Sequence, residues 1–325
     1  MKLKVLVIIL CLCSIVLFCA CNETGQYLIF GTFVEIDLSG VKAGKTVSKI
    51  EKRFVEIENE MSVQKGTSDV YKINNAKAGE KVYVCVDTLK VLETAKNIYE
   101  MSNGAFDPTV YPLVKLWKFS ADTYVGAPNA LPTESEIETA LKSVGFDKIS
   151  IDFDGGFVTK SSDTVMIDLG GLAKGFAAGE GLSIASGGKG IINVGGNIVA
   201  VGRDLKVGVQ NPRGEGYVGT FTLSCGQSVS TSGDYERHYL YKGINYHHII
   251  SPFSGYPTGI KDDSDLISVT VVSDKYTLCD AVATAVMVLG KNDGKALIER
   301  LGLCGVIIDK NLNITVVGNL DFQKK

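Results

Sequence analysis

The chain has 325 residues, of which 45% are hydrophobic and 21% charged, with 36 glycines and 7 prolines. This composition is typical of a globular protein and excludes a disordered or collagen-like chain. The formal net charge of -3 and the single tryptophan provide neither a basic field for phosphates nor a base-stacking platform, so no nucleic-acid partner is expected.

The start of the chain has the pattern of a secretory signal. Two early lysines precede residues 5–20, which are apolar except for one serine. This run is short for a membrane-spanning helix, which needs about 20 residues. Ala20 directly before Cys21 resembles a lipobox, although Phe18 stands where an aliphatic residue is usual. Residues 1–20 are therefore predicted to be a lipoprotein signal peptide and Cys21 the lipidated residue. An ordinary signal peptide with a nearby cut is the alternative.

The first half of the remaining chain alternates strand and helix patterns. In chain order, the predicted elements are a strand over 27–38 with a break at Gly31, a helix over 48–61, a strand over 81–86, a helix capped by Asp87 that ends at residue 101, a helix over 133–144, and a hairpin of 149–153 with 157–160. Apolar residues recur at helical spacing in the helices and alternate in the strands. Thr133 and Glu136 form a capping box.

The second half contains more hairpins. Its predicted elements are an apolar strand over 165–169, a helix that ends before Gly187, strands over 191–194, 198–201, 207–209, 218–223 and 266–272, a helix over 279–289 closed by Gly290, a short helix over 295–301, and a hairpin of 305–309 with 313–317. Frequent hairpins favour an α+β fold with mixed or antiparallel sheets and packed helices over a doubly wound parallel sheet. No linker divides the chain, so residues 21–325 are predicted to form one large domain.

The strongest chemical signal lies at residues 168–174, where a strand pattern meets two glycines and a helix. Gly170 and Gly171 let the backbone approach a ligand closely. The start of a helix attracts anions, and Lys174 adds a full positive charge. This pattern suits a phosphorylated ligand, but it is neither a P-loop nor a GxGxxG fingerprint. A tight turn with a surface lysine is the alternative.

Asp280 and Thr284 are separated by one helical turn, so both side-chain oxygens lie on the same face. A carboxylate and a hydroxyl suit Mg²⁺, with water or substrate phosphate completing its shell. The alternative is structural: Asp280 caps the helix and Thr284 bonds back to the backbone.

His247 and His248 stand together before the segment 249–259. Neighbouring residues of a strand face opposite ways, so the pair is a poor metal site. One of them facing a cleft as a general base fits better, and a structural histidine is the alternative. Residues 230–233 are read as a hydroxyl-rich turn.

In this order and spacing, the segments resemble the ApbE-type flavin transferases, which are FAD:protein FMN transferases. The resemblance rests on six motifs, at residues 61–74, 104–117, 168–175, 193–197, 231–233 with 248–257, and 280–290. It implies an α+β fold, FAD as substrate and Mg²⁺ as cofactor. It also implies transfer of FMN to a Thr or Ser hydroxyl of a target protein, with release of AMP.

The resemblance carries roles onto individual positions. It implies FAD contacts at Phe30, Gln64, Ala105, Phe106, Asp107, Asp168, Lys174 and Ile250, Mg²⁺ contacts at Gly171, Asp280, Ala283 and Thr284, and a general base at His248. Three positions depart from the usual pattern: Gln64 replaces an aromatic residue, Phe30 a methionine, and Ser251 an aspartate. A polar Gln64 admits water, so hydrolysis of FAD to FMN and AMP is expected to compete with transfer.

Targets of the resembled family lie in membrane redox complexes and other exported flavoproteins. The chain is therefore expected to be an exported bacterial lipoprotein, anchored through Cys21 and facing the periplasm, with the inner membrane as its expected location. Two other functions remain open. One is an FAD pyrophosphatase, and the other is a non-catalytic FAD-binding lipoprotein, against which Asp280, Thr284 and His248 argue.

Overall fold

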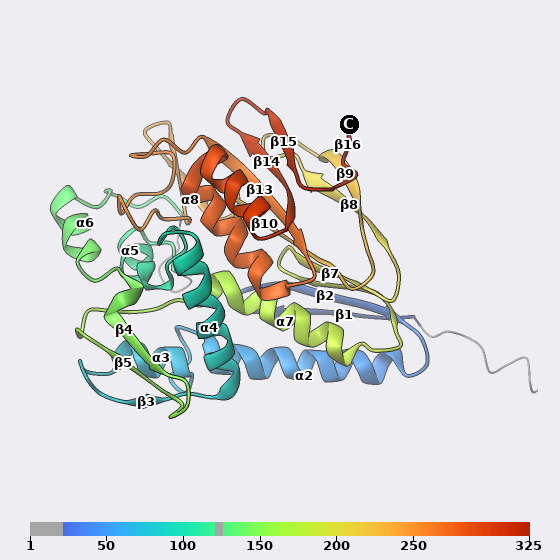
Figure 1. Ribbon diagram of the computed structural model, residues 1–325, viewed down its shortest axis with the longest axis horizontal. Helices are drawn as coiled ribbons and strands as arrows, with labels where there is room; N and C mark the ends of the chain where they lie inside the picture. Colours follow the sequence, from blue (N-terminus) through green and yellow to red (C-terminus); the bar gives the residue numbers. More distant parts are fainter. Residues whose placement is uncertain (1–21, 121–125) are drawn as a thin grey trace, which may run out of the picture.

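The computed structural model describes residues 22–120 and 126–325 (Figure 1). Its framework is an eight-stranded sheet whose strands, in spatial order, are β1 (Asn22–Ile29), β2 (Thr32–Ser39), β6 (Lys189–Val194), β7 (Asn197–Val201), β10 (Ser228–Gly233), β13 (Leu266–Ser273), β14 (Cys304–Asp309) and β15 (Ile314–Val317). Every strand pairing among the described residues is antiparallel. The α+β prediction is confirmed.

The helices of the described residues are α2 (Ala43–Met61), α3 (Asp69–Asn75), α4 (Val86–Met101), α5 (Tyr111–Leu116), α6 (Glu134–Leu141), α7 (Gly170–Ile184) and α8 (Tyr276–Arg300), with short 3₁₀ turns at Pro108–Val110 and Phe146–Lys148. Of these, α2, α7 and α8 pack directly on the sheet. Helix α7 lies between α2 and α8, and α8 packs on β10 and β13 (Figure 1). Gly290 has φ 76° and kinks α8, as the predicted helix end there anticipates.

Alternation along the strands separates two cores. On β14, Ile307 belongs to the core under the helices, whereas Val306 and Ile308 face the opposite side. That side is covered by a smaller sheet of β16 (Gln323–Lys324), β9 (Tyr217–Leu223) and β8 (Leu205–Gln210). The sheet is therefore buried on both faces at its centre, which explains why every residue of β13 is buried.

A third core joins segments far apart in the chain. Trp117 is 1% exposed, stacks on Tyr246 at 5.5 Å, and donates its indole N–H to the Gly255 carbonyl at 2.8 Å. Tyr246 belongs to the hairpin of β11 (His238–Tyr241) and β12 (Ile244–His247). The core therefore anchors the segment 104–117 beside the segment 248–257.

The remaining sheet contains β3 (Val82–Tyr83), β5 (Phe157–Lys160) and β4 (Ile149–Asp152). The predicted hairpin and the capping box at Thr133 and Glu136 are confirmed. The strand predicted over 81–86 is wrong in extent, because only β3 pairs. The predicted cap at Asp87 is also wrong: Cys85 stands at the N-cap, and its sulfur accepts from the Thr88 N–H at 3.4 Å.

Two further predictions are corrected by the structure. Residues 230–233 are not a turn but part of β10, which pairs with β13 from Ser228 to Gly233. Residues 165–169 are not a strand, because their backbone groups bond to side chains and loops instead of a sheet partner. Those bonds hold the segment that leads into α7.

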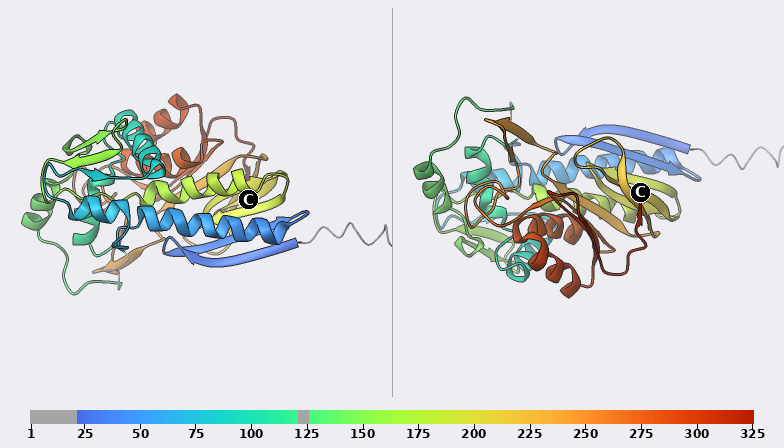
Figure 2. Two further views of the ribbon diagram at one scale, coloured as in Figure 1. Left: turned by 90° about the horizontal axis from the view of Figure 1, so that it is seen from below. Right: turned by 90° about the horizontal axis from the view of Figure 1, so that it is seen from above.

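Cys21 and the predicted signal peptide over residues 1–20 lie outside the described residues. Within the described ranges, none of the helices combines the length and apolarity that crossing a bilayer would require. Figure 2 shows the β1–β2 hairpin lying along α2, with the chain entering β1 at one end of the molecule.

Candidate functional site

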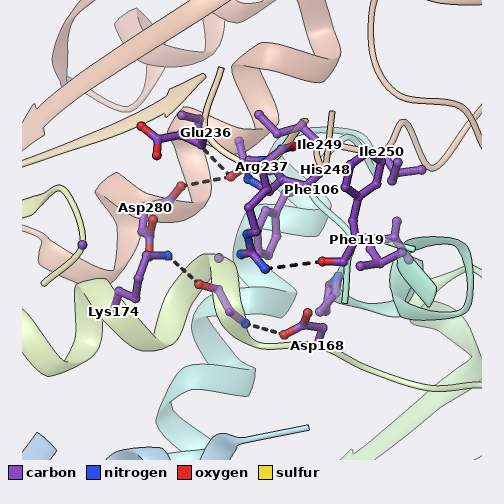
Figure 3. A pocket seen from close by; sticks show the side chains of 18 of the residues that line it. Phe106, Phe119, Asp168, Lys174, Glu236, Arg237, His248, Ile249, Ile250 and Asp280 are labelled. Atoms are coloured by element: carbon purple, nitrogen blue, oxygen red, sulfur yellow. Dashed lines mark hydrogen bonds and ion pairs between the residues drawn. The ribbon is translucent and has the colours of Figure 1, made fainter. Parts of the chain in front are cut away.

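A cavity of about 300 Å³ opens where the β1–β2 turn, the first turns of α7 and α8, and the chain around β11 and β12 meet (Figure 3). Most residues singled out from the sequence line it, namely Phe30, Ala105, Phe106, Asp107, Asp168, Gly171, Lys174, His248, Ile250, Asp280 and Thr284. The fold therefore gathers five separate segments of the chain into one site.

Two predicted site residues lie elsewhere. Gln64 lines an adjoining cavity of about 140 Å³, whose wall shares Phe30, Asp168 and Lys174 with the main cavity. Ala283 is fully buried in α8, next to Thr284, and does not line either cavity.

The start of α7 brings positive charge to one wall of the cavity. Asp168 precedes the helix, and its carboxylate accepts from the Gly170 N–H at 2.8 Å. Lys174 donates to the Gly170 carbonyl at 2.8 Å and lies 3.3 Å from the Asp280 carboxylate. The partial positive charge of the helix start and the ammonium group thus act on the same cavity wall.

Lys174 and Asp280 lie close together because α7 packs tightly against α8. A Cβ at Gly175 would lie 2.6 Å from the Tyr276 carbonyl oxygen and 3.2 Å from the Asp280 Cβ. Only glycine lets α7 approach the start of α8 this closely. The Gly175 N–H accordingly lies 3.3 Å from the Asp280 carboxylate.

Two buried polar residues fix the segment that leads into α7. The Asn74 side chain accepts from the Ile167 N–H at 2.7 Å and donates to the Ile167 carbonyl at 2.9 Å, as a strand partner would. Lys160 is 3% exposed and donates to the carbonyls of Asn74 and Val165 at 2.9 and 3.0 Å. Burial lowers the pKa of Lys160. These bonds replace the predicted strand and hold Asp168 at the cavity.

Asp280 and Thr284 offer the donor set that Mg²⁺ prefers. Asp280 is 5% exposed, and the Thr284 hydroxyl lies 3.2 Å from the Ser232 hydroxyl on β10. A Cβ at Gly171 would lie 3.8 Å from the Thr284 hydroxyl and 3.2 Å from the Phe106 ring, so the absence of a side chain keeps this space open. Carboxylate, hydroxyl and backbone carbonyl oxygens fit a hard cation.

The protein supplies few charges to such a cation. Within the described ranges, no three His, Cys, Asp or Glu side chains converge as metal ligands. Asp280 is the carboxylate beside Thr284, and its present partner is Lys174. A cation here would complete its shell with water and substrate phosphate oxygens.

The two adjacent histidines have different surroundings. His247 is 3% exposed, and its Nε2 lies 3.1 Å from the Thr258 carbonyl. His248 lines the cavity, and its Nδ1 lies 3.3 Å from the Arg237 carbonyl. When Nδ1 donates to that carbonyl, Nε2 is the nitrogen that can accept a proton.

The electrostatics of the cavity keep His248 neutral. Burial lowers its pKa well below the usual value for histidine, and the positive charges of Arg237 and Lys174 lower it further. A neutral imidazole at neutral pH is the form that a general base requires.

The β1–β2 turn forms another wall. Ile29 pairs with Thr32, so Phe30 and Gly31 form a two-residue loop, with φ of 58° and 65°. Both central residues of such a turn have positive φ, a conformation that is uncommon for phenylalanine. The Phe30 N–H donates to Glu58 at 2.7 Å, which helps to hold the turn at the cavity.

Residues 105–107 form the apolar end of the site. Ala105 and Phe106 are 2% and 5% exposed. The Asp107 carboxylate accepts from the Thr109 N–H and hydroxyl at 2.8 and 2.6 Å, and burial raises its pKa. Asp107 therefore shapes the turn while it contributes to the cavity wall.

Some lining residues gave no signal in the sequence. Glu236, Arg237 and Phe119 line the main cavity, and Arg237 also lines the adjoining one. None of them belongs to a short motif with a fixed spacing. They become recognisable only when the fold places residues 236–237 opposite the start of α7.

The model of the ApbE family matches residues 30–308. The FAD:protein FMN transferase of Rhodobacter capsulatus is 30% identical over 86% of this chain, which covers 54% of that relative, about half its length. The FAD:protein FMN transferase of Klebsiella pneumoniae is 30% identical, with 82% of this chain and 83% of the relative covered.

Solved structures agree in fold. The crystal structure of the ApbE protein from Thermotoga maritima has a TM-score of 0.83 and 29% sequence identity, and the match covers 91% of this chain and 97% of that one. The family match spans most of the chain and includes every residue that lines the main cavity. This chain therefore belongs to the ApbE family.

Proposed function

We propose that this chain is an FAD:protein FMN transferase, which transfers FMN from FAD to a Thr or Ser hydroxyl of a target protein and releases AMP. The observation that carries the proposal is one cavity that unites the Asp280–Thr284 oxygen pair, Lys174 at the start of α7, and His248. Relatives that this chain matches over most of their length are named FAD:protein FMN transferases.

The proposed reaction balances without another reagent. The acceptor hydroxyl oxygen forms a bond to the phosphorus of the FMN half. The bond between that phosphorus and the bridging oxygen breaks, and AMP leaves with this oxygen and its electron pair. The hydroxyl proton moves to Nε2 of His248. Lys174 and the helix start bind the phosphate oxygens throughout.

Asp280, Thr284 and the Gly171 backbone are the residues that would hold Mg²⁺, with Ala283 beside them in α8. When bound, this ion supplies charge neutralisation for the pyrophosphate. Phe106 and Ile250 provide apolar walls against which a planar ring can pack.

The test is to incubate the full chain, purified in detergent, with FAD, Mg²⁺ and a peptide that carries an acceptor Thr. AMP and peptide mass are followed together. AMP with an FMN-sized mass gain supports transfer. Formation of AMP without peptide modification would indicate FAD hydrolysis instead of transfer. Binding of FAD without formation of AMP would indicate a non-catalytic FAD carrier.

One observation favours hydrolysis as a second activity. Gln64 is exposed and lines the cavity that adjoins Asp168 and Lys174. A polar side chain here leaves water access to the pyrophosphate, and excluding water suppresses such side reactions.

Gln64→Tyr is therefore expected to slow FAD hydrolysis without acceptor by about tenfold, corresponding to about 1.4 kcal/mol of barrier, while transfer is retained. AMP release without peptide measures this rate. Gln26→Tyr on β1, an exposed position, is the matched control. Equal hydrolysis by wild type and Gln64→Tyr would refute the role of Gln64.

We also propose that Cys21 carries a lipid that anchors the chain to the periplasmic face of the inner membrane. The first described residue, Asn22, begins β1, so the anchor would join the fold without a linker. Two or more acyl chains give stable membrane binding. This position suits acceptor flavoproteins of membrane redox complexes.

Cys21→Ser is expected to move the protein from the membrane fraction to the soluble fraction and to abolish incorporation of labelled fatty acid. Fractionation and labelling of whole cells measure both effects. Cys225→Ser, at an exposed cysteine, is the control. Membrane retention of an unlabelled Cys21→Ser protein would contradict the lipid anchor.

A further inference from the structure

Arg237 is placed to act on a ligand in the site. It precedes β11 and lines both the main cavity and the adjoining one. Figure 3 shows its side chain reaching into the cavity toward the Phe119 carbonyl. The guanidinium Nη1 lies 3.5 Å from that oxygen, a separation at which a hydrogen bond contributes little.

Its charge is less compensated than that of the two arginines that form ion pairs in the described residues. Arg213 lies 2.6 Å from Asp234, and Arg53 lies 2.9 Å from Glu180. No ion pair of the described residues includes Arg237. Lys174, the other cation of the cavity, already lies 3.3 Å from Asp280. Arg237 therefore contributes most of the uncompensated positive charge of this wall.

We propose that Arg237 binds the pyrophosphate of FAD from the β11 side, while Lys174 binds it from α7, and that Arg237 stabilises the charge gained by the departing AMP phosphate. This inference rests on the proposed function. The planar guanidinium matches two phosphate oxygens at once, which an ammonium group cannot do.

The same residue contacts the general base. The Arg237 backbone carbonyl accepts a hydrogen bond from the backbone N–H of His248 at 3.0 Å, and it lies 3.3 Å from the ring Nδ1 of His248. This backbone contact survives substitution of the Arg237 side chain. A variant therefore removes the guanidinium while the orientation of His248 is retained.

The test compares Arg237→Met and Arg237→Lys with wild type, each as the full chain in detergent with FAD, Mg²⁺ and acceptor peptide. Arg237→Met is expected to lower kcat/KM for AMP release by about 100-fold, the effect of losing one preorganised donor. Arg237→Lys keeps the positive charge but lacks the paired donors of the planar guanidinium, so its kcat/KM is expected to lie between those of Arg237→Met and wild type. Millimolar guanidinium should raise kcat of Arg237→Met only.

Arg203→Met, at an exposed position in the turn after β7, removes the same charge outside the site and should keep wild-type kcat/KM. A kcat/KM of Arg237→Met within threefold of wild type would overturn the proposal. So would a loss accompanied by a lowered Tm, without rescue by guanidinium and without recovery in Arg237→Lys, because that pattern indicates a structural role.

Failure of the proposed function is distinguishable. If wild type formed no AMP, the affinity for FAD, measured by titration, would still test whether Arg237 binds the pyrophosphate. A Kd for FAD raised about tenfold in Arg237→Met would support the pyrophosphate contact. This change corresponds to a loss of about 1.4 kcal/mol of binding free energy. Unchanged affinity would overturn it.

Discussion

Asp280→Ala is expected to abolish transfer, lowering the rate of AMP formation by about three orders of magnitude. Charge stabilisation by a metal ion is worth several kcal/mol, and each 1.36 kcal/mol is tenfold in rate. Asp280 is the carboxylate beside Thr284, and its removal leaves hydroxyl and carbonyl oxygens that bind Mg²⁺ weakly. AMP release at saturating FAD measures the effect.

A second readout separates metal binding from folding. With FAD present, Mg²⁺ should raise the Tm of wild type and leave that of Asp280→Ala unchanged, because only a bound ligand stabilises the folded state. Asp274→Ala removes an exposed carboxylate just before α8 and should keep both responses. AMP formation by Asp280→Ala within tenfold of wild type would exclude Asp280 as the metal ligand.

Hydrophobic periodicity predicted most of the framework. The spacing of Ile50, Phe54 and Ile57 predicted the buried face of α2, and all three side chains are fully buried. The turn residues of the 149–160 hairpin predicted the pairing of β4 with β5. Local patterns suffice where an element buries one face and ends at a turn.

The wrong predictions over residues 165–169 and 230–233 have one cause in common, which is tertiary context. The apolar run 165–169 has strand composition, but the Asn74 side chain occupies the place of a neighbouring strand. Residues 230–233 have turn composition, yet β13 pairs with all four of them and holds them extended. A polar side chain or a partner strand that is distant in sequence leaves no mark on the local pattern.

The site was partly predictable for a different reason. Asp280 with Thr284, and Gly171 with Lys174, are one helical turn or less apart, so their spacing alone places them together. Arg237 and Phe119 meet only through the fold, since 118 residues separate them. Sequence patterns therefore singled out Asp280, Thr284 and the start of α7, which line the cavity, but not the Arg237 guanidinium.

His248→Gln is expected to lower acceptor-dependent kcat by about 1000-fold, the usual contribution of a positioned general base. FAD binding should be retained, because the amide keeps the size and polarity of the ring. His247→Gln is the matched control: it removes the buried contact with the Thr258 carbonyl, so its main effect should be a lower Tm. Peptide mass and AMP release under the same conditions measure transfer.

The pH profile gives an independent test of the base. Burial lowers the pKa of His248 well below 6.5, so the imidazole stays neutral at and somewhat below that pH. Protonation removes the acceptor lone pair, so kcat/KM, which reports the free enzyme, should fall only in more acidic solution, by tenfold per pH unit. In His248→Gln this acidic limb should vanish, whereas His247→Gln should retain it. An unchanged acidic limb in His248→Gln would assign the proton transfer to another group and leave His248 a role in binding alone.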